Sequence, residues 1–358
     1  MLSMQKFGAW VAAGSLCVLT ACGGGGDGGG NPNPPGSGTP PSTGNPPSGR
    51  TFYTYVTNDL DTQDTISIFS ADTNLGELRA AGTMNAGVNP AGVTVVGNRF
   101  VYVANNGVVP SDAGNISAYS INSANGSLTP VAGSPFAAGR NPTGVTANPA
   151  GTFLYAPNFE GQSISVFRIE ASGALTSVGA SSTNFPQTNT VRNGVAPAAV
   201  AITPNGQYAY SANKSRTNAP TVGPIGSGTV TVFRVESNGS LTAIQNVPAG
   251  VDPIALAIDA SGRSLYVANN ELPDDPTTVV IEQNRGHVTM FPINSDGTLG
   301  ASSSYVAGLL PQAVTVDPAG GTVFVANSGE PVVSLFNRDT NGNLTANGNL
   351  GVRNSPWG

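Results

Sequence analysis

The sequence predicts an all-β fold, a β-propeller whose blades are four-stranded antiparallel sheets. Three observations predict it: a short phrase ending in asparagine recurs six times after residue 50, tight-turn pairs such as Asn-Gly separate alternating stretches, and charged residues make up only 9% of the chain. The 47 glycines suit many short strands joined by turns rather than a solvated helical protein. Six repeats indicate six blades, and seven is the alternative if one blade is degenerate.

Residues 1–21 read as a signal peptide. Lys6 and the short apolar run after it are typical of an exported protein, and the run is too short for a permanent membrane helix. Its end, Leu19-Thr20-Ala21-Cys22, resembles the bacterial lipobox, so we expect cleavage before Cys22 and lipidation of its sulfur. An ordinary signal peptide with an incidental cysteine is the alternative. Gly23 at the sorting position implies the outer membrane, on a side that the sequence leaves open.

Residues 22–50 form a tether between the anchor and the repeats. They contain no large apolar side chain and are rich in glycine and proline. Such a segment cannot bury enough surface to offset its ordering entropy, so we predict that it is disordered. The propeller is then expected to occupy residues 51–358.

Each repeat pairs an aromatic residue with an asparagine three positions later. The copies end at Asn58, Asn105, Asn158, Asn213, Asn269 and Asn327. We expect one strand before this phrase, the phrase itself as the second strand, an alternating third strand such as residues 229–235, and a fourth strand after a turn such as Asn238-Gly239. A single site would not need six asparagines, so we interpret them as structural.

The two ends of the repeat region are expected to share one blade. The first repeat begins at its second strand near Phe52, and the last runs out at residues 354–358. The tail Asn354-Ser355-Pro356 resembles the start of a first strand, as in Asn89-Pro90. Because this closing strand is cut short at Gly358, the sequence predicts weak closure of the ring.

Composition argues against several kinds of partner and cofactor. A net charge of −6, with Lys6 and Lys214 as the sole lysines, does not suit nucleic acid, which needs a clustered positive surface. Cys17 and Cys22 are the two cysteines and His287 is the single histidine, so the propeller region offers neither thiolate nor histidine clusters to a metal. We expect no cofactor, no metal and a monomer.

The repeats resemble the YVTN-repeat and lactonase-type β-propellers, which are similar to 6-phosphogluconolactonase. Residues 55–58 spell Tyr-Val-Thr-Asn, and third strands such as 165–169 and 230–235 lead to x-Gly-x-Leu-Thr endings. The lactonase members typically carry Pro-Arg-His where one blade hands over to the next. The matching positions here, at 90–92, 142–144, 197–199, 253–255 and 311–313, contain neither Arg nor His, whereas Asn269-Asn270-Glu271 approximates the family's Asn-Glu.

Long connections gather on one predicted face of the ring. Residues 177–197, 213–228 and 269–286 join second to third strands or fourth to first strands, and these connections share a face. The candidate site residues on this face are Arg140, Glu271 and His287 as catalytic groups, and Arg192, Asp252 and Arg353 as ligand-binding groups. The alternative for each is an ordinary surface residue.

Two functions remain open at the level of sequence. The leading hypothesis is a recognition module that binds an envelope protein or a glycan through its long-loop face, held to the membrane by the anchor at Cys22. The alternative, implied by the family resemblance, is a lactonase that hydrolyses a sugar lactone. Loss of binding on deletion of 214–227 and 270–286 would favour the first, and turnover of a lactone would favour the second.

Overall fold

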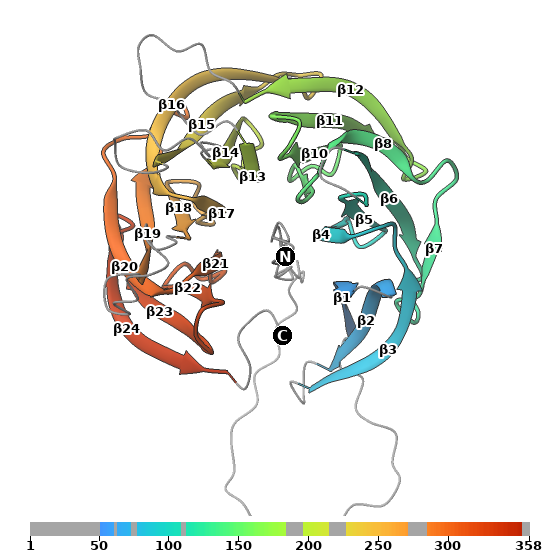
Figure 1. Ribbon diagram of the computed structural model, residues 1–358, viewed down its shortest axis with the longest axis horizontal. Coiled ribbons are helices and arrows are strands. Elements are labelled where there is room, and N and C mark those ends of the chain that lie inside the picture. Colours follow the sequence, from blue (N-terminus) through green and yellow to red (C-terminus); the bar gives the residue numbers. More distant parts are fainter. Residues whose placement is uncertain are drawn as a thin grey trace, which may run out of the picture.

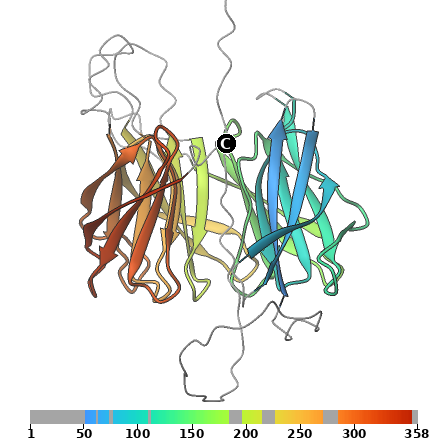
Figure 2. The same ribbon diagram turned by 90° about the horizontal axis from the view of Figure 1, so that it is seen from below.

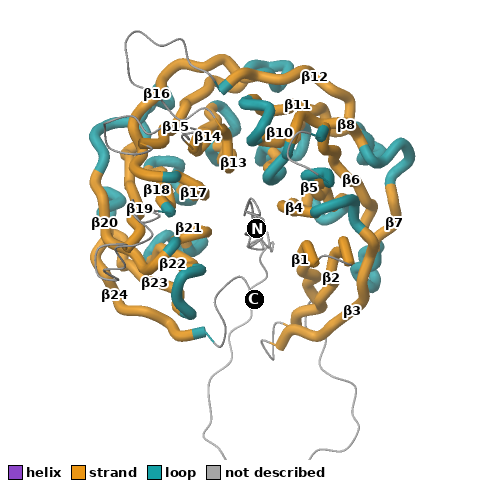
Figure 3. The backbone as a smooth tube through the Cα atoms, in the orientation of Figure 1, coloured by secondary structure: helices purple, strands orange, loops and turns teal. Residues whose placement is uncertain are grey.

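The computed structural model describes residues 51–60, 63–72, 77–108, 112–183, 196–214, 227–270 and 285–352. These residues are strand and loop throughout (Figure 3), so they include no helix that could cross a membrane. The strands form six antiparallel sheets, which confirms the predicted all-β fold and the count of six repeats. The signal peptide, Cys22 and the tether lie outside the described residues.

Each sheet is one blade, numbered here in chain order. The first three blades comprise β1 (Thr51–Leu60), β2 (Gln63–Asp72) and β3 (Glu77–Asn85); β4 (Pro90–Val96), β5 (Phe100–Asn105), β6 (Ala113–Ile121), β7 (Leu128–Pro130) and β8 (Phe136–Arg140); and β9 (Thr146–Ala147), β10 (Phe153–Asn158), β11 (Ser163–Ile169) and β12 (Leu175–Ser182). The last three comprise β13 (Ala196–Ile202), β14 (Tyr208–Lys214), β15 (Ser227–Val235) and β16 (Leu241–Val251); β17 (Pro253–Ile258), β18 (Ser264–Asn269), β19 (Arg285–Pro292) and β20 (Ser303–Leu309); and β21 (Pro311–Val316), β22 (Thr322–Asn327), β23 (Val332–Arg338) and β24 (Leu344–Gly351).

The blades stand side by side around a central axis, with the first strand of each full blade innermost and the fourth outermost (Figures 1 and 2). Two faces follow from this order. The loop face carries the connections from second to third strands and from fourth to first strands. The turn face carries the tight turns of the other two kinds, in which glycines such as Gly126 and Gly342 adopt φ values of 73° and 90°. The predicted Asn-Gly turns are therefore confirmed at these positions.

Two blades depart from the four-strand pattern. The first has three strands and begins with β1 at the second-strand position, as the sequence predicts. In the second blade the fourth strand is split, because residues 131–135 loop out and both β7 and β8 then pair with β6. The predicted closing strand at 354–358 lies outside the described residues.

Neighbouring blades pack through apolar side chains from their second and third strands. Between the second and third blades, Tyr102 and Ala104 of β5 lie against Leu154 and Ala156 of β10 in one buried cluster. We call each such interface a seam. Clusters of the same kind fill the other seams, so the core of the protein is divided among the seams rather than gathered in one centre.

A buried tyrosine hydroxyl crosses each of five seams to a glycine carbonyl in the turn of the next blade. The donor and acceptor pairs are Tyr55 and Gly126 at 2.8 Å, Tyr102 and Gly173 at 2.9 Å, Tyr155 and Gly239 at 3.1 Å, Tyr210 and Gly297 at 2.8 Å, and Tyr266 and Gly342 at 2.7 Å. Burial raises the pKa of Tyr55 and of Tyr155 to about 12, so these hydroxyls remain protonated donors at neutral pH. The sixth blade has Phe324 at this position and no hydroxyl to donate.

The described ring is open between the sixth and first blades (Figure 1). Substantial packing joins β1 to β4, β10 to β13, β13 to β17 and β17 to β21, and nothing comparable joins described strands of the sixth blade to the first. Val56 of β1 is 42% exposed, whereas Val103 at the same position of β5 is fully buried. Leu78 of β3 is likewise 63% exposed, against 5% for its counterpart Leu128. The first blade thus exposes apolar side chains that the second blade buries at the same positions.

The repeated asparagines are structural, in agreement with the sequence interpretation. Asn105 donates from Nδ2 to Asn115 Oδ1 at 2.8 Å and to Ser117 Oγ at 2.9 Å, and its Oδ1 accepts from Gly87 N at 3.1 Å. These bonds tie the second strand of a blade to its third strand and to the preceding blade. Asn158 makes the same set of contacts, with Ser163, Ser165 and Gly139.

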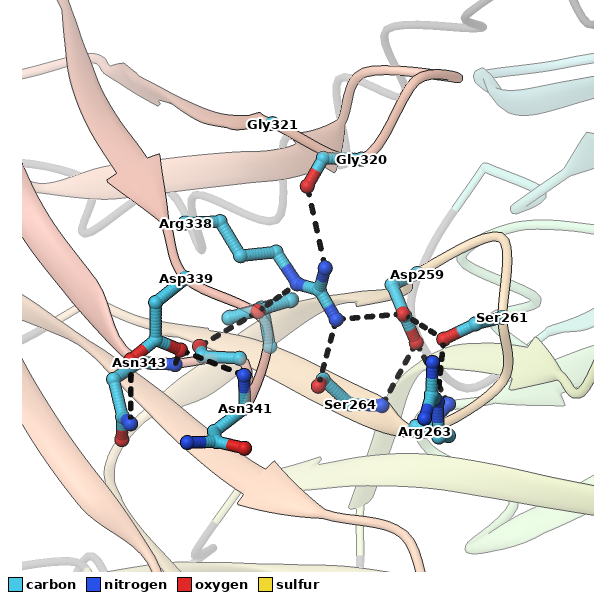
Figure 4. Close-up of polar contacts among 12 residues, drawn as sticks. Asp259, Ser261, Arg263, Ser264, Gly320, Gly321, Arg338, Asp339, Asn341 and Asn343 are labelled. Carbon is cyan, nitrogen blue, oxygen red and sulfur yellow. Dashed lines mark hydrogen bonds and ion pairs between the residues drawn. The ribbon is translucent and has the colours of Figure 1, made fainter.

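A polar cluster joins the fifth and sixth blades on the turn face (Figure 4). Arg338 at the end of β23 donates to Asp259 Oδ2 at 2.7 Å, to Tyr266 Oη at 2.8 Å and to the Gly320 carbonyl at 3.3 Å. Asp259 also accepts backbone N–H groups from Arg263 and Ser264, both at 2.8 Å. The carboxylate therefore closes the turn after β17 and holds the guanidinium of the next blade.

Candidate functional site

The innermost strands begin on the loop face with an unusual backbone conformation. Asn89, Asn141, Asp252 and Leu310 each precede a proline and have φ values of 52°, 53°, 49° and 53°. Asn and Asp tolerate this left-handed region better than Leu does. The carbonyl of each accepts the N–H of the residue after a repeated asparagine, as Asp252 O does from Asn270 N at 2.9 Å. This bond fixes the start of each inner strand beside the end of a second strand.

A glycine at the start of the third strand lets neighbouring blades approach closely at the same place. A Cβ on Gly228 would lie 2.1 Å from Pro253 Cδ and 2.7 Å from the Asn213 carbonyl. Gly114 and Gly286 stand in the same relation to Pro142 and Pro311. In each of these seams, the residue after the repeated asparagine is thereby brought next to the residue before the proline.

These two positions form an ion pair between the fourth and fifth blades. Lys214 Nζ lies 3.7 Å from Asp252 Oδ2, and the side chains are 20% and 26% exposed. The separation is longer than a hydrogen bond, so both groups can also contact a bound molecule. A carboxylate can accept a proton and an ammonium can stabilise a developing negative charge, and this seam presents both on the loop face.

Other seams place amides at these positions. Asn106 and Asn141 occupy both positions at the seam between the second and third blades. At the seam between the fifth and sixth blades, Asn270 occupies the first position, and Gln312 lies directly after the proline rather than before it. The side-chain oxygen of each of these four residues is buried and accepts no hydrogen bond within the described chain. Buried acceptors without partners are costly, which makes the inner rim of the loop face a candidate site for a ligand with hydrogen-bond donors.

The structure places the predicted site residues in separate parts of the ring. Arg140 ends β8 in the second blade, is exposed, and donates to the Glu160 carbonyl at 3.0 Å. His287 lies in β19 of the fifth blade, on the other side of the ring (Figure 1). These two proposed catalytic groups are therefore not brought together. Glu271, Arg192 and Arg353 lie outside the described residues, as do most of the long loops in which they were expected to act.

His287 occupies a position that supports the repeated asparagine in other blades. It pairs directly with Asn269 in the strand register, where Asn105 faces Asn115 and Asn158 faces Ser163. Those partners accept a hydrogen bond from the asparagine amide. Asn269 instead donates to Thr289 Oγ1 at 2.9 Å, and its Oδ1 is buried without a partner. The histidine thus replaces a structural contact in its blade.

Asp252 is the predicted ligand-binding residue that the structure sets in a polar pair. Its partner Lys214 is one of two lysines in the sequence and is not among the predicted site residues. Lys214 directly follows a repeated asparagine, as Asn106 and Asn270 do, and this shared position is the sequence feature that could have identified it. Among the described residues, no three His, Cys, Asp or Glu side chains gather as a metal site would require.

The profile of the family described as "Lactonase, 7-bladed beta-propeller" matches residues 52–187 and 180–279. No curated protein sequence matches the chain. Among solved structures, a periplasmic gluconolactonase of Pseudomonas aeruginosa has a TM-score of 0.64 and 22% identity, covering 86% of this chain and 84% of its own.

Two further structures share the fold. A protein of unknown function from Desulfotomaculum acetoxidans has a TM-score of 0.59 and 16% identity, over 86% of this chain and 89% of its own. A candidate 6-phosphogluconolactonase of Bacteroides fragilis has a TM-score of 0.50 and 23% identity, over 88% of this chain and 98% of its own. At these identities the likeness establishes the fold alone. The family is described as seven-bladed, and the described residues here form six blades.

Proposed function

The chain belongs to the lactonase family of seven-bladed β-propellers, and from this premise we propose that it hydrolyses a sugar lactone on its loop face. The observation that carries the proposal is the ion pair of Lys214 and Asp252, 3.7 Å apart across the seam between the fourth and fifth blades. Both residues lie within the range that the family profile matches. The family match and this ion pair together favour the lactonase over the recognition module, which was the leading hypothesis from the sequence.

The chemistry of lactone opening suits this pair. A water molecule attacks the carbonyl carbon and the carboxylate of Asp252 takes a proton from that water. The ring C–O bond then breaks, and its oxygen takes the proton back from Asp252, which restores the carboxylate. Negative charge builds on the carbonyl oxygen during the attack, and the ammonium of Lys214 stabilises it. The partial exposure of both side chains leaves them accessible to a substrate.

The test is hydrolysis of glucono-1,5-lactone and of its 6-phosphate by the purified protein, measured against a buffer blank. We expect saturable turnover, and a fall in kcat of about 100-fold or more for Asp252→Asn and for Lys214→Met. Asn at 252 suits the backbone, because Asn89 and Asn141 adopt the same φ. Glu236→Gln is the matched control, since Glu236 belongs to an exposed ion pair with Arg234 on the turn face. A folded protein with no turnover would reject the lactonase and leave the recognition module.

We further propose that the chain is anchored in the cell envelope through a lipid on Cys22. Support comes from the lipobox-like run that precedes it and the glycine-rich segment that follows. Expression of the full chain in a Gram-negative bacterium and partition into Triton X-114 tests the anchor. The unchanged chain should enter the detergent phase and Cys22→Ser should stay in water, whereas equal partition of both would contradict the proposal.

A further inference from the structure

The seam between the second and third blades repeats the geometry that holds the ion pair. A Cβ on Gly114 would lie 2.2 Å from Pro142 Cδ and 2.5 Å from the Asn105 carbonyl, as Gly228 lies against Pro253 and Asn213. In the latter seam, the flanking side chains of Lys214 and Asp252 come within 3.7 Å of each other. The corresponding flanking residues, Asn106 and Asn141, thus lie on the two sides of their own seam.

Both of these amides are buried and their oxygens have no partner. Asn106 is 8% exposed and Asn141 is 4% exposed, and each Oδ1 accepts no hydrogen bond within the described chain. The asparagine side chains are shorter than that of Lys214, and neither amide oxygen accepts a hydrogen bond from the other residue. Two neutral acceptors without partners therefore lie at one seam, where they suit hydrogen-bond donors and offer no charge of their own to a phosphate or a hard cation.

The inner strand of the third blade leaves room beside this pair. Strands β4, β17 and β21 begin at the proline itself, whereas β9 begins at Thr146, four residues after Pro142. Within this irregular stretch Gly144 is buried, yet a Cβ added to it would meet no atom within 4 Å. A small space consequently lies three residues along the chain from Asn141.

We propose that Asn106, Asn141 and the space beside Gly144 form a subsite for the hydroxyl groups of an uncharged polyhydroxylated ligand. Hydroxyl donors satisfy the two amide oxygens, and the carbon chain that bears them fills the space. The inference deepens the proposed lactonase, because it assigns this subsite to the hydroxylated part of the lactone. A site built around hydroxyl groups should discriminate strongly against a compound that lacks them.

The experiment measures both turnover and binding for the same set of proteins. The turnover substrate is glucono-1,5-lactone, and the binding probe, followed by calorimetry, is D-glucitol, with 1,6-hexanediol as the analogue that lacks internal hydroxyls. For Asn106→Leu, Asn141→Gly and Gly144→Val we expect a rise of about tenfold in KM and in the Kd for glucitol, with kcat within about twofold; glycine is chosen at 141 because it tolerates the positive φ there. Asn347→Leu, at an exposed position of β24, is the control and should change neither.

The outcomes separate the subsite from the proposed reaction. Glucitol binding that is weakened by the three substitutions supports the subsite even where the unchanged protein shows no turnover, in which case the lactonase alone fails. Turnover with unchanged KM in all three variants overturns the subsite and leaves the lactonase. Equal affinity for glucitol and 1,6-hexanediol, or no glucitol binding by the unchanged protein, also overturns it. Thermal midpoints within about 2 °C of the unchanged protein show that a loss of binding is not a loss of fold.

Discussion

Arg338 and Asp259 form a nearly dry ion pair that joins the last two blades, with 2.7 Å between Nη2 and Oδ2 and side-chain exposures of 11% and 1%. Arg338 stands opposite Leu344 in its blade, as Ile169 stands opposite Leu175 and Val235 opposite Leu241. Other blades thus use an aliphatic residue where this blade uses an arginine. At this position the sixth blade forms an ion pair with its neighbour, whereas the other blades pack an aliphatic side chain.

We predict that Arg338→Ala lowers the free energy of unfolding by about 3–5 kcal/mol, because it leaves the buried carboxylate of Asp259 without its partner. The double variant Asp259→Asn, Arg338→Ile should lie within about 1 kcal/mol of the unchanged protein, since it restores the aliphatic contact and keeps an acceptor for the turn. Urea denaturation measures both. A double variant as unstable as the single one would show that the ion pair is needed in itself.

The seam tyrosines give a second prediction. Tyr210→Phe should cost about 1–2 kcal/mol, because it removes a buried hydrogen bond and leaves the Gly297 carbonyl without its donor. The converse substitution, Phe324→Tyr, should change stability by less than about 0.5 kcal/mol, since the described ring offers no next blade to receive the hydroxyl. A stabilisation of about 1 kcal/mol by Phe324→Tyr would instead mean that the sixth blade meets the first in solution.

Alkaline pH should weaken the same seams. Burial raises the pKa of Tyr55 and Tyr155 to about 12 and also raises the pKa of Tyr102, Tyr210 and Tyr266 above the usual 10. The stability that the protonated tyrosines contribute is therefore fully present below pH 10 and is lost as pH rises toward 12. The loss should approach about 1.4 kcal/mol per pH unit for each such tyrosine. Urea midpoints at pH 9, 10 and 11 check this, and Tyr155→Phe should flatten the slope.

Two glycines should differ in their sensitivity to substitution by alanine. Gly228→Ala should destabilise the fold by about 1–3 kcal/mol, because its Cβ would overlap Pro253 and the Asn213 carbonyl in a packed seam. Gly144→Ala should change stability by less than about 0.5 kcal/mol, because its Cβ would meet open space. Thermal denaturation of both variants tests the seam geometry on which the candidate site rests. Equal effects would contradict it.

The sequence carries most of the fold because its signals are local. An asparagine three residues after an aromatic, an alternating third strand and a glycine in the fourth-strand turn each act within one blade, so periodicity alone locates them. The structural role of Asn105 and Asn158 followed from their repetition. The split of the fourth strand into β7 and β8 was not visible, since the extra residues 131–135 differ little in composition from the turns around them.

The site was harder to predict because its groups meet across seams. Lys214 and Asp252 are 38 residues apart, and Asp259 and Arg338 are 79 apart, so no local pattern pairs them. Arg140 was predicted to lie at a strand entry, whereas the structure places it at the end of β8, and its guanidinium donates to the Glu160 carbonyl. The sequence does not distinguish Asn106 and Asn141 as site residues, because neutral polar residues are common in loops. They stand out in the structure because their side-chain oxygens are buried without hydrogen-bond partners.

A closed propeller is a circle in which every blade has two neighbours, whereas the described blades of this protein form a line with two ends. The free energy of unfolding is then the sum of the stabilities of the single blades and of the interfaces between neighbours along that line, as in a solenoid. The first and sixth blades each contribute one seam where the others contribute two, so they fray first and the middle blades last. Amide exchange should accordingly be fastest in β1–β3 and β21–β24, with protection rising toward β10 and β14, a gradient that a circle cannot show.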